Sequence, residues 1–386
     1  IVRFAFGLTA DLESEGRGME SLEGALSILL SHAKPVTDAQ ELPLLDALNR
    51  IAAEDVVSPM NVPPFNRSPL DGYALHSEDI ADASREHPAV VKVIGEACAG
   101  CGEVFRPARG EAVRVMTGAP VPETCDCVIR QEDTDEGMDY AEIYAPVSHG
   151  RNICLAGEDV AAGEVLVHAG EKLTATHLAV LAGVGQARVK VVRRVRAALL
   201  CTGDELTQPG QPLTFGKIYD SNQMALTARL AELGVECVQL GELSDDPQNV
   251  ADALAHAALE ADVILTTGGV SVGKKDIFHQ VLPLMGAERL FWRIAMKPGS
   301  PLLCGLYQDK LMICLSGNPF AALCCFEVFA VPTLRRLSGE TSIDAKRVKT
   351  RLRGEFPKPS PGRRLIRAVF DGETVRPASG NHSSGS

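Results

Sequence analysis

The sequence lacks a long apolar run, a basic leader and an excess of positive charge. No apolar stretch reaches the roughly 20 residues of a membrane-spanning helix. The longest runs, 311–315 and 321–332, are broken by Gly317, Pro319 and Glu327. We therefore expect no membrane insertion. Because the chain does not begin with Met and no basic segment precedes an apolar core, we also expect no secretion signal and a cytoplasmic location.

The charge balance limits the classes of partner. Lys and Arg number 38 against 50 Asp and Glu, and the formal net charge is −12. This balance disfavours nonspecific nucleic-acid binding, which needs a basic face. It does not exclude an anionic ligand, because a local site can oppose the charge of the whole protein. The length of 386 residues predicts two to four domains.

The cysteines do not suggest a disulfide framework. Eleven scattered residues, an odd number, favour free and mostly buried thiols in a reducing compartment. Cys98 and Cys101, with Cys125 and Cys127 beyond a loop, could supply four zinc thiolates. The C-x-C pair is a poor half of such a site, however, and its flanks are typical of strands. We therefore favour core thiols and leave the role of Cys98 and Cys101 open.

The first half of the chain combines helical and strand patterns. Apolar spacing predicts helices over 19–33 and 42–57, and four prolines within 58–70 predict an extended linker. Short apolar runs between Gly, Pro and acidic turns predict an all-β domain over 90–143. A short helix over 174–183 begins with a threonine suited to N-capping.

From about residue 189 strands and helices alternate. Strands are predicted at 195–201, 235–240, 263–265, 290–294 and 311–315. Helices are predicted after Asp220 and Asp246, and after Asn318 through Arg336. The alternation predicts a parallel sheet with helices on both faces, in which ligands bind at the carboxyl ends of the strands.

A glycine-rich turn follows one buried strand. Residues 261–276, ADVILTTGGVSVGKKD, combine a strand, a turn at Gly268 and Gly269, and the start of a predicted helix. Glycines let the backbone approach a phosphate closely, and the N–H groups of a first helical turn point at it. For this stretch alone, a tight turn in an ordinary parallel sheet is an equally good interpretation.

Charged residues are predicted at the same sheet edge. Glu205 and Asp276 follow strands, and Lys297 lies in the stiff loop MKPGSP near the SGNP turn. Two carboxylates, a lysine and two N–H-rich turns suit a phosphate-bearing ligand together with Mg²⁺. Taken singly, the two acids are also consistent with solvated loop residues. Asp71 in LDGYAL is equally consistent with a turn aspartate.

Nine motifs occur in order between residues 63 and 321, within a family resemblance that runs from about residue 42 to the end of the chain. They are PPFNRSPLDGYAL, VRVMTGAPVP, GRNICLAGEDV, LLCTGDEL, IYDSNQ, DDPQN, ADVILTTGGVSVGKKD, MKPGSP and LSGNPFA. At this spacing the sequence resembles the MoeA/gephyrin-E family, the molybdopterin molybdenumtransferases. The resemblance implies a Mg²⁺-dependent transferase of molybdenum cofactor biosynthesis. Such an enzyme inserts molybdate into adenylylated molybdopterin and releases AMP.

The resemblance also implies a multidomain α/β plus β fold in an elongated homodimer. A helical and extended connecting domain would comprise 19–65 and 151–188, and an all-β domain 66–150. A three-layer parallel-sheet molybdopterin-binding domain would span 189–337. Residues 338–386, rich in Arg, Lys and Pro, would begin a C-terminal β-barrel that stops before it can close, so we expect this domain to be truncated.

Functional roles follow from the resemblance residue by residue. The catalytic positions would be Asp71, Thr117, Glu205, Asp276 and Lys297, and the metal ligands Glu205, Asp276 and Asp159. The substrate-binding positions would be Gly268, Gly269, Ser271, Gly273, Asp245, Pro298, Ser300, Asn318, Pro319, Arg363 and Ser384. In the family the site lies between subunits, so Asp71 and Thr117 would act on the partner's α/β domain. A molybdopterin-adenylylating protein is the expected supplier of substrate.

Some positions depart from the family pattern. Leu70 replaces a methionine, and Ser300 stands where many members carry a second lysine. Ser316 and Ala321 replace a proline and a serine, so we expect weaker molybdate binding. The recipient molybdoenzymes and the choice between molybdate and tungstate are left open by the sequence.

Two other functions are compatible with parts of this pattern. A gephyrin-like dimeric scaffold would bind a partner peptide, but it has no need of charges clustered at a sheet edge. A competence-type or pterin-adenylylating protein would share only the α/β domain, and the β domain over 66–150 argues against it. Molybdate-dependent AMP release separates the enzyme from the scaffold.

Overall fold

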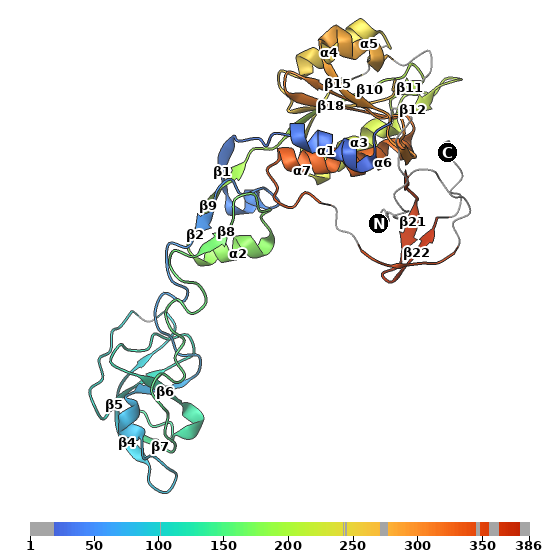
Figure 1. The fold of residues 1–386 in the computed structure, drawn as a ribbon. Coiled ribbons are helices and arrows are strands. Elements are labelled where there is room, and N and C mark those ends of the chain that lie inside the picture. Colours follow the sequence, from blue (N-terminus) through green and yellow to red (C-terminus); the bar gives the residue numbers. More distant parts are fainter. Residues whose placement is uncertain are drawn as a thin grey trace.

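The molecule is drawn out between two sheets at its opposite ends (Figure 1). This computed structural model describes residues 19–100, 102–241, 243, 245–270, 277–344, 348–354 and 363–378. One end is a six-stranded sheet covered by helices, and the other is a five-stranded sheet. No helix in the described part of the chain combines the length and the apolar composition of a bilayer-spanning segment.

The six-stranded sheet is mixed rather than fully parallel. In sheet order its strands are β13 (Glu236–Gln239), β10 (Arg196–Cys201), β14 (Val263–Thr267), β18 (Lys310–Leu315), β17 (Leu303–Tyr307) and β15 (Glu288–Trp292). Strands β13, β10, β14 and β18 are parallel neighbours, as predicted. Strand β17 runs antiparallel to both β18 and β15, so the prediction of a parallel sheet is wrong there.

Helices cover both faces of this sheet, as the alternating pattern predicted. The helices are α1 (Leu22–His32), α3 (Ser221–Glu232), α6 (Pro319–Cys325) and α7 (Val331–Leu337) on one face, and α4 (Pro247–Ala257) and α5 (Phe278–Met285) on the other (Figure 1). A π-helical segment, Phe326–Ala330, joins α6 to α7. Because successive strand residues point to opposite faces, Val263 and Leu265 pack under the first group and Ile264 under the second.

The predicted capping residues begin their helices. Asp220 accepts a hydrogen bond from the N–H of Gln223 at 2.9 Å, and Asp246 accepts one from the N–H of Asn249 at 2.8 Å. These bonds satisfy donors that the first helical turn leaves without an intrahelical partner. Thr174 caps α2 (Ala175–Gly183) in the same way.

The predicted helix over 42–57 is wrong. Strand β1 (Ala39–Pro43) pairs with β9 (Arg188–Val192), and one 3₁₀ turn, Leu44–Ala47, follows it. The backbone then reverses at Asn49, whose φ is 63°. The segment ends in β2 (Val56–Val57), which pairs with β8 (Val165–Val167). Backbone hydrogen bonds to a distant part of the chain therefore replace the helical ones.

Strands dominate residues 90–143, as the short apolar runs predicted, with a 3₁₀ turn at Gln131–Asp133. The five-stranded sheet runs β6 (Cys127–Arg130), β3 (Gly72–Leu75), β5 (Glu111–Val115), β4 (Ala89–Ala97) and β7 (Tyr140–Ile143). Each of its faces has a core of its own. Tyr73 and Leu75 pack on one face and Ala74 on the other, since side chains alternate along β3.

Short strands complete the described fold. Strand β11 (Leu206–Thr207) pairs with β12 (Ile218–Tyr219) beside the six-stranded sheet (Figure 1). Four strands lie in the described part of 338–386, the segment expected to begin a β-barrel: β19 (Arg351–Leu352), β20 (Arg363–Arg364), β21 (Ala368–Phe370) and β22 (Thr374–Pro377). Strand β20 pairs with β16 (Met296–Lys297), and this pairing attaches the C-terminal segment to the α/β end of the molecule.

The thiols of Cys125 and Cys127 belong to cores rather than to a metal centre. Cys125 packs on one face of the five-stranded sheet and Cys127 on the other. Burial raises the pKa of each thiol to about 12, which opposes formation of a zinc-binding thiolate. Cys98 is exposed, and Cys101 lies outside the described residues.

Candidate functional site

Three parallel strands end together at one edge of the six-stranded sheet. The N–H of Thr202, after β10, donates to the carbonyl of Thr267 at 2.9 Å. The N–H of Gly268, after β14, donates to the carbonyl of Leu315 at 3.2 Å. These bonds bring the Glu205 turn, the glycine turn and the SGNP turn to the same edge, where an open α/β sheet binds its ligands.

The glycine turn depends on a close backbone approach at Gly268. Its φ is +92°, and a Cβ there would lie 2.3 Å from the carbonyl oxygen of Thr202. Only glycine fits this position without moving the neighbouring strand end. Gly269 follows with φ +63°, and its carbonyl accepts the N–H of Phe278 in α5 at 3.3 Å. Ser271, Gly273 and Asp276 lie outside the described residues.

Glu205 and Asp245 lie on neighbouring turns beside this edge. The main chain of Glu205 accepts the N–H of Ile218 at 2.8 Å, and its side chain is exposed. Asp245 Oδ2 accepts the N–H of Asp204 at 3.3 Å, and Lys217 donates to the Asp204 carbonyl. The structure thus brings Asp245 to the Glu205 turn, although the two residues are far apart in sequence.

The SGNP turn begins α6 and is held by a residue with no role in the sequence-based prediction. Asn318 Oδ1 accepts the N–H of Ala321 at 3.1 Å and caps the helix, whose first residue is Pro319. Asn222 Nδ2, from α3, donates to the carbonyl of Gly317 at 2.8 Å. Asn222 lies within the IYDSNQ motif, and this motif could have identified it as a site residue. The motif was interpreted only as the start of a helix.

The Lys297 loop packs against α6. The Lys297–Pro298 peptide is cis, and Gly299 follows with φ +96°. A Cβ on Gly299 would lie 2.4 Å from Cys325 Sγ, so the loop and the helix are in direct contact. Ser300 Oγ donates to the carbonyl of Ile294 at 3.0 Å, which ties this hydroxyl into the loop itself.

Two cations lie side by side at this loop. Strands β16 and β20 are paired in parallel, with Met296 opposite Arg363 and Lys297 opposite Arg364. The Lys297 side chain is exposed. Arg363 Nη2 lies 2.6 Å from Glu23 Oε1 of α1. The register places Arg364 opposite the predicted catalytic lysine, and the predicted substrate-binding Arg363 opposite Met296, one position earlier. Ser384 lies outside the described residues.

A second group of predicted residues lies at the other end of the chain. Asp71 Oδ1 accepts the backbone N–H of Thr117 at 2.7 Å and its hydroxyl at 2.8 Å. These two bonds, the backbone one first, lower the pKa of the exposed Asp71 carboxyl. The pair joins the start of β3 to the turn after β5, in the sheet that Figure 1 shows farthest from the Glu205 edge.

Asp159 is placed with this second group. Its Oδ2 lies 3.8 Å from Arg67 Nη2, and the Arg67 backbone pairs with Pro120 and Cys154. Arg67 lies in the NRSPLDGYAL part of a motif, but no functional role was predicted for it. Asp159 was expected to share a metal ion with Glu205. Within one chain it lies beside Arg67 instead, apart from Glu205.

The fit of Mg²⁺ depends on oxygen donors at the Glu205 edge. Glu205 offers an exposed carboxylate, the hard donor that Mg²⁺ prefers. The described residues contain no group of three or more His, Cys, Asp or Glu side chains able to hold a metal ion. Asp276, the second predicted ligand at this edge, lies outside the described residues.

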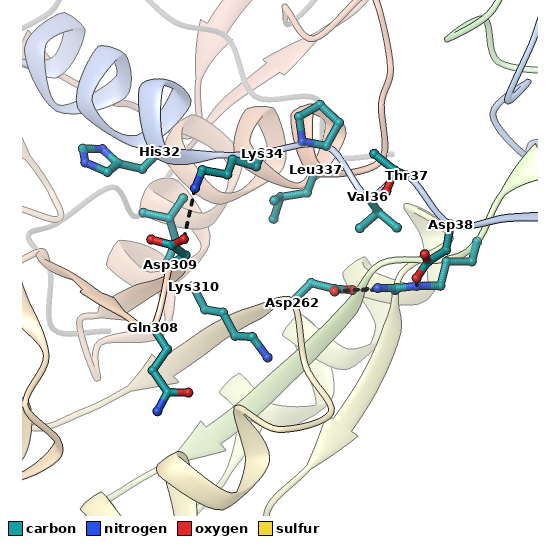
Figure 2. Close-up of a pocket in the computed structure, with 13 residues that line it drawn as sticks. His32, Lys34, Val36, Thr37, Asp38, Asp262, Gln308, Asp309, Lys310 and Leu337 are labelled. Carbon is teal, nitrogen blue, oxygen red and sulfur yellow. Dashed lines mark hydrogen bonds and ion pairs between the residues drawn. The ribbon is translucent and has the colours of Figure 1, made fainter.

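The pocket drawn in Figure 2 lies at the opposite edge of the same sheet. It has a volume of about 270 Å³ and is lined by residues that include Lys34, Asp38, Arg193, Asp262 and Lys310. Asp262 precedes β14 and Lys310 begins β18. Its cations are already engaged: Arg193 with Asp262, Lys34 with Asp309, and Lys310 with the Ala258 carbonyl. This pocket does not belong to the Glu205 edge.

Known proteins share both halves of this architecture. Residues 20–185 match the family model of the MoeA N-terminal region (domain I and II), and residues 198–336 match that of a probable molybdopterin binding domain. The molybdopterin molybdenumtransferase of Haemophilus influenzae is 37% identical over 326 residues, which cover 83% of this chain and 78% of the relative. The protein of the same name from Bacillus subtilis is 37% identical over 345 residues, 88% of this chain and 80% of the relative.

A solved structure agrees with these relatives along nearly the whole chain. The crystal structure of the molybdopterin biosynthesis moea protein from Pyrococcus horikosii matches with a TM-score of 0.84 at 34% identity, covering 95% of this chain and 92% of that one. The crystal structure of a molybdopterin biosynthesis moeA protein from Pyrococcus horikoshii OT3 matches with a TM-score of 0.81 at 28% identity, covering 95% of this chain and 91% of that one. The family inferred from the nine motifs is thereby confirmed, and the chain belongs to the molybdopterin molybdenumtransferase (MoeA) family.

Proposed function

We propose that this protein is a molybdenum insertase that transfers molybdate into adenylylated molybdopterin and releases AMP, giving molybdenum cofactor. One observation carries the proposal. In a chain of this family, the Glu205 turn, the Gly268–Gly269 turn and the Asn318 turn meet at the carboxyl edge of one sheet. A phosphate-bearing ligand suits an edge that presents backbone N–H groups and cations together.

The charges at this edge match the chemistry of the reaction. Lys297 and Arg363, on paired strands, would bind oxygens of molybdate and of the pterin phosphate through charge-assisted hydrogen bonds. The bond between the adenylyl phosphorus and the pterin phosphate oxygen breaks when a water oxygen attacks that phosphorus. AMP and the pterin phosphate result. When bound by Glu205 and Asp276, Mg²⁺ would neutralise negative charge on the phosphates.

We further propose a homodimer in which each site draws on both chains. Asp71 and Thr117 form a hydrogen-bonded pair far from the Glu205 edge of their own chain (Figure 1). A two-fold partner would bring its Asp71 and Thr117, with its Asp159, to that edge. A scaffold without catalysis is less favoured, because it leaves the charges at Glu205 and Lys297 without a role. The adenylylated substrate implies a pterin-adenylylating protein as supplier.

Mixed dimers test the function and the shared site together. D71A and E205A homodimers should each lose molybdate-dependent AMP release. After dissociation and reassociation of an equal mixture, half of the dimers are mixed and each has one intact site, so about a quarter of wild-type activity should return. A mixture of D71A and T117A is the matched control and should show no gain over the mean of its two homodimers, because every site then carries one defect.

The outcomes separate two failures. No molybdate-dependent AMP release from the wild-type protein would reject the insertase function. Activity in the wild type, but none in the D71A and E205A mixture after subunit exchange has been verified, would reject the shared site.

A further inference from the structure

Trp292, the single tryptophan of the chain, contacts the glycine turn directly. Its indole Nε1–H donates to the carbonyl of Val270 at 3.3 Å. Trp292 ends the edge strand β15, and Val270 follows β14, so the indole reaches across the ends of β17 and β18. Trp292 lies outside the nine sequence motifs. Its hydrogen bond to Val270 places it at the Glu205 edge.

Neighbouring side chains fix the plane of this indole. The His279 ring, from the first turn of α5, lies edge-on to it, with ring centroids 4.5 Å apart and an interplanar angle of 87°. The Arg293 guanidinium lies 4.4 Å from the centre of the Trp292 ring system. Edge-to-face and cation–π contacts of this kind favour one orientation of the ring. The Nε1–H group is therefore directed at Val270 by packing as well as by its own bond.

The Val270 backbone is held on both sides. Val270 is 2% exposed, its own carbonyl binds Trp292, and the preceding carbonyl, of Gly269, accepts the N–H of Phe278. In a trans peptide the C=O and N–H groups point in opposite directions. The N–H of Val270 therefore faces away from α5.

Two donors of the turn are available to a ligand. The N–H of Gly268 is used by the Leu315 carbonyl. For the N–H groups of Gly269 and Val270, no hydrogen-bond partner lies among the residues that the structure describes. Adjacent N–H groups in a turn with positive φ form a concave site for an anion.

We propose that Trp292 is a positioning residue for substrate binding. By holding the Val270 carbonyl, it orients the turn so that the N–H groups of Gly269 and Val270 donate to the phosphate of adenylylated molybdopterin. His279 and Arg293 keep the indole in place. This inference rests on the proposed function for the chemistry of the ligand, while the orientation of the turn rests on contacts within this chain.

The W292F variant isolates the indole N–H, because phenylalanine keeps an aromatic ring and removes the donor. One neutral hydrogen bond corresponds to a three- to tenfold change in binding, so the KM for adenylylated molybdopterin should rise by about that factor while kcat changes less than about twofold. The matched control is Y307F, which removes one hydroxyl group, the acceptor of a bond from Gln308 Nε2, at the opposite edge of the same sheet. Its KM should equal that of the wild type.

A measurement without substrate checks the same contact. In W292F the backbone amides of Gly268 and Phe278, which bond to Leu315 and to Gly269, should exchange hydrogen faster than in the wild type, and in Y307F they should not. Unchanged exchange in W292F, an unchanged KM, or equal effects of W292F and Y307F would overturn the inference. If the wild-type protein releases no AMP, the proposed function fails, and hydrogen exchange still decides whether Trp292 holds the turn.

Discussion

Arg193 binds Asp262 at two points, with Nη1 and Nη2 each 2.8 Å from a different carboxylate oxygen. Arg193 lies where the chain crosses from β9 to β10, and its Nε also binds Asp38, on the crossing from α1 to β1, at 3.0 Å. One guanidinium therefore joins both crossings to the start of β14. We therefore expect the angle between the two ends of the molecule, and with it the position of Asp71, to depend on this junction.

Removal of the guanidinium should loosen the junction. R193Q leaves the Asp262 side chain, 18% exposed, without its bidentate partner, and the free energy of unfolding should fall by about 1–3 kcal/mol. The control is R196Q, whose ion pair with Glu236 is half exposed and should contribute less than about 1 kcal/mol. Denaturant unfolding measures both changes, and small-angle scattering should show a wider spread of shapes for R193Q only. Equal effects of the two variants would contradict the role of this junction.

The same carboxylate predicts a pH dependence. Burial raises the pKa of Asp262, but hydrogen bonds from Arg193 and from the N–H of Arg196 outweigh it, and the pKa is lowered overall. A lowered folded-state pKa adds stability that is fully present above the unfolded value of about 4 and is lost as the pH falls through the folded value. The difference in unfolding free energy between wild type and D262N should therefore be constant near neutral pH and shrink below about pH 4. A difference that grows on acidification would disprove the assignment.

Two glycines of the candidate site should respond differently to alanine. At Gly268 a Cβ would meet the Thr202 carbonyl at 2.3 Å with φ +92°, whereas at Gly317 the nearest atom, the Gly268 Cα, would lie at 3.4 Å. G268A should cost about 1–3 kcal/mol of stability and remove most of the AMP release. G317A makes only ordinary contacts and should keep the fold. Thermal unfolding and AMP release measure the pair, and a G268A variant as active as G317A would show that the turn tolerates displacement.

Local signals predicted most elements near the site. Asp220, Asp246 and Asn318 cap their helices because a short polar side chain before an apolar run satisfies the first-turn donors. The strand predicted at 263–265 was evident from its continuous apolar run, typical of a strand covered on both faces, and the structure extends it to Thr267. Such features depend on neighbouring residues, so a single sequence contains the necessary information.

Elsewhere the prediction failed where strands pair with segments distant in sequence or through a turn without a typical signal. Leu44, Ala47 and Leu48 have helical spacing, but Leu48 is 44% exposed, and backbone pairing of 39–43 with β9 decides the local structure. Strand β17 returns to β18 through Gln308 and Asp309, which have φ of 47° and 66°. Neither turn residue is glycine or asparagine, so the hairpin lacked its usual signal. Contacts such as Asn222 to Gly317 and Trp292 to Val270 join residues distant in sequence and require the fold.

The Thr117 hydroxyl should matter for orientation rather than for charge. Asp71 receives two bonds from Thr117, and the backbone bond, which contributes most to the lowered pKa, survives any side-chain change. T117V should therefore leave Asp71 ionised near neutral pH while freeing its carboxylate to rotate. If Asp71 acts at the site of a partner subunit, kcat/KM for AMP release should fall about tenfold, comparable with one charge-assisted hydrogen bond.

The T117S variant keeps the hydroxyl and should restore kcat/KM to within about twofold of the wild type. The range from about pH 6 to 8 lies well above the ordinary pKa of an aspartate, so Asp71 should stay ionised throughout it. The pH profile of kcat/KM for T117V in this range should therefore parallel that of the wild type. A profile that shifts on T117V would mean that the hydroxyl controls protonation instead. Equal losses in T117V and T117S would contradict this role. Serine keeps the hydroxyl and lacks only the γ-methyl group, so the packing of that methyl group would then explain the loss.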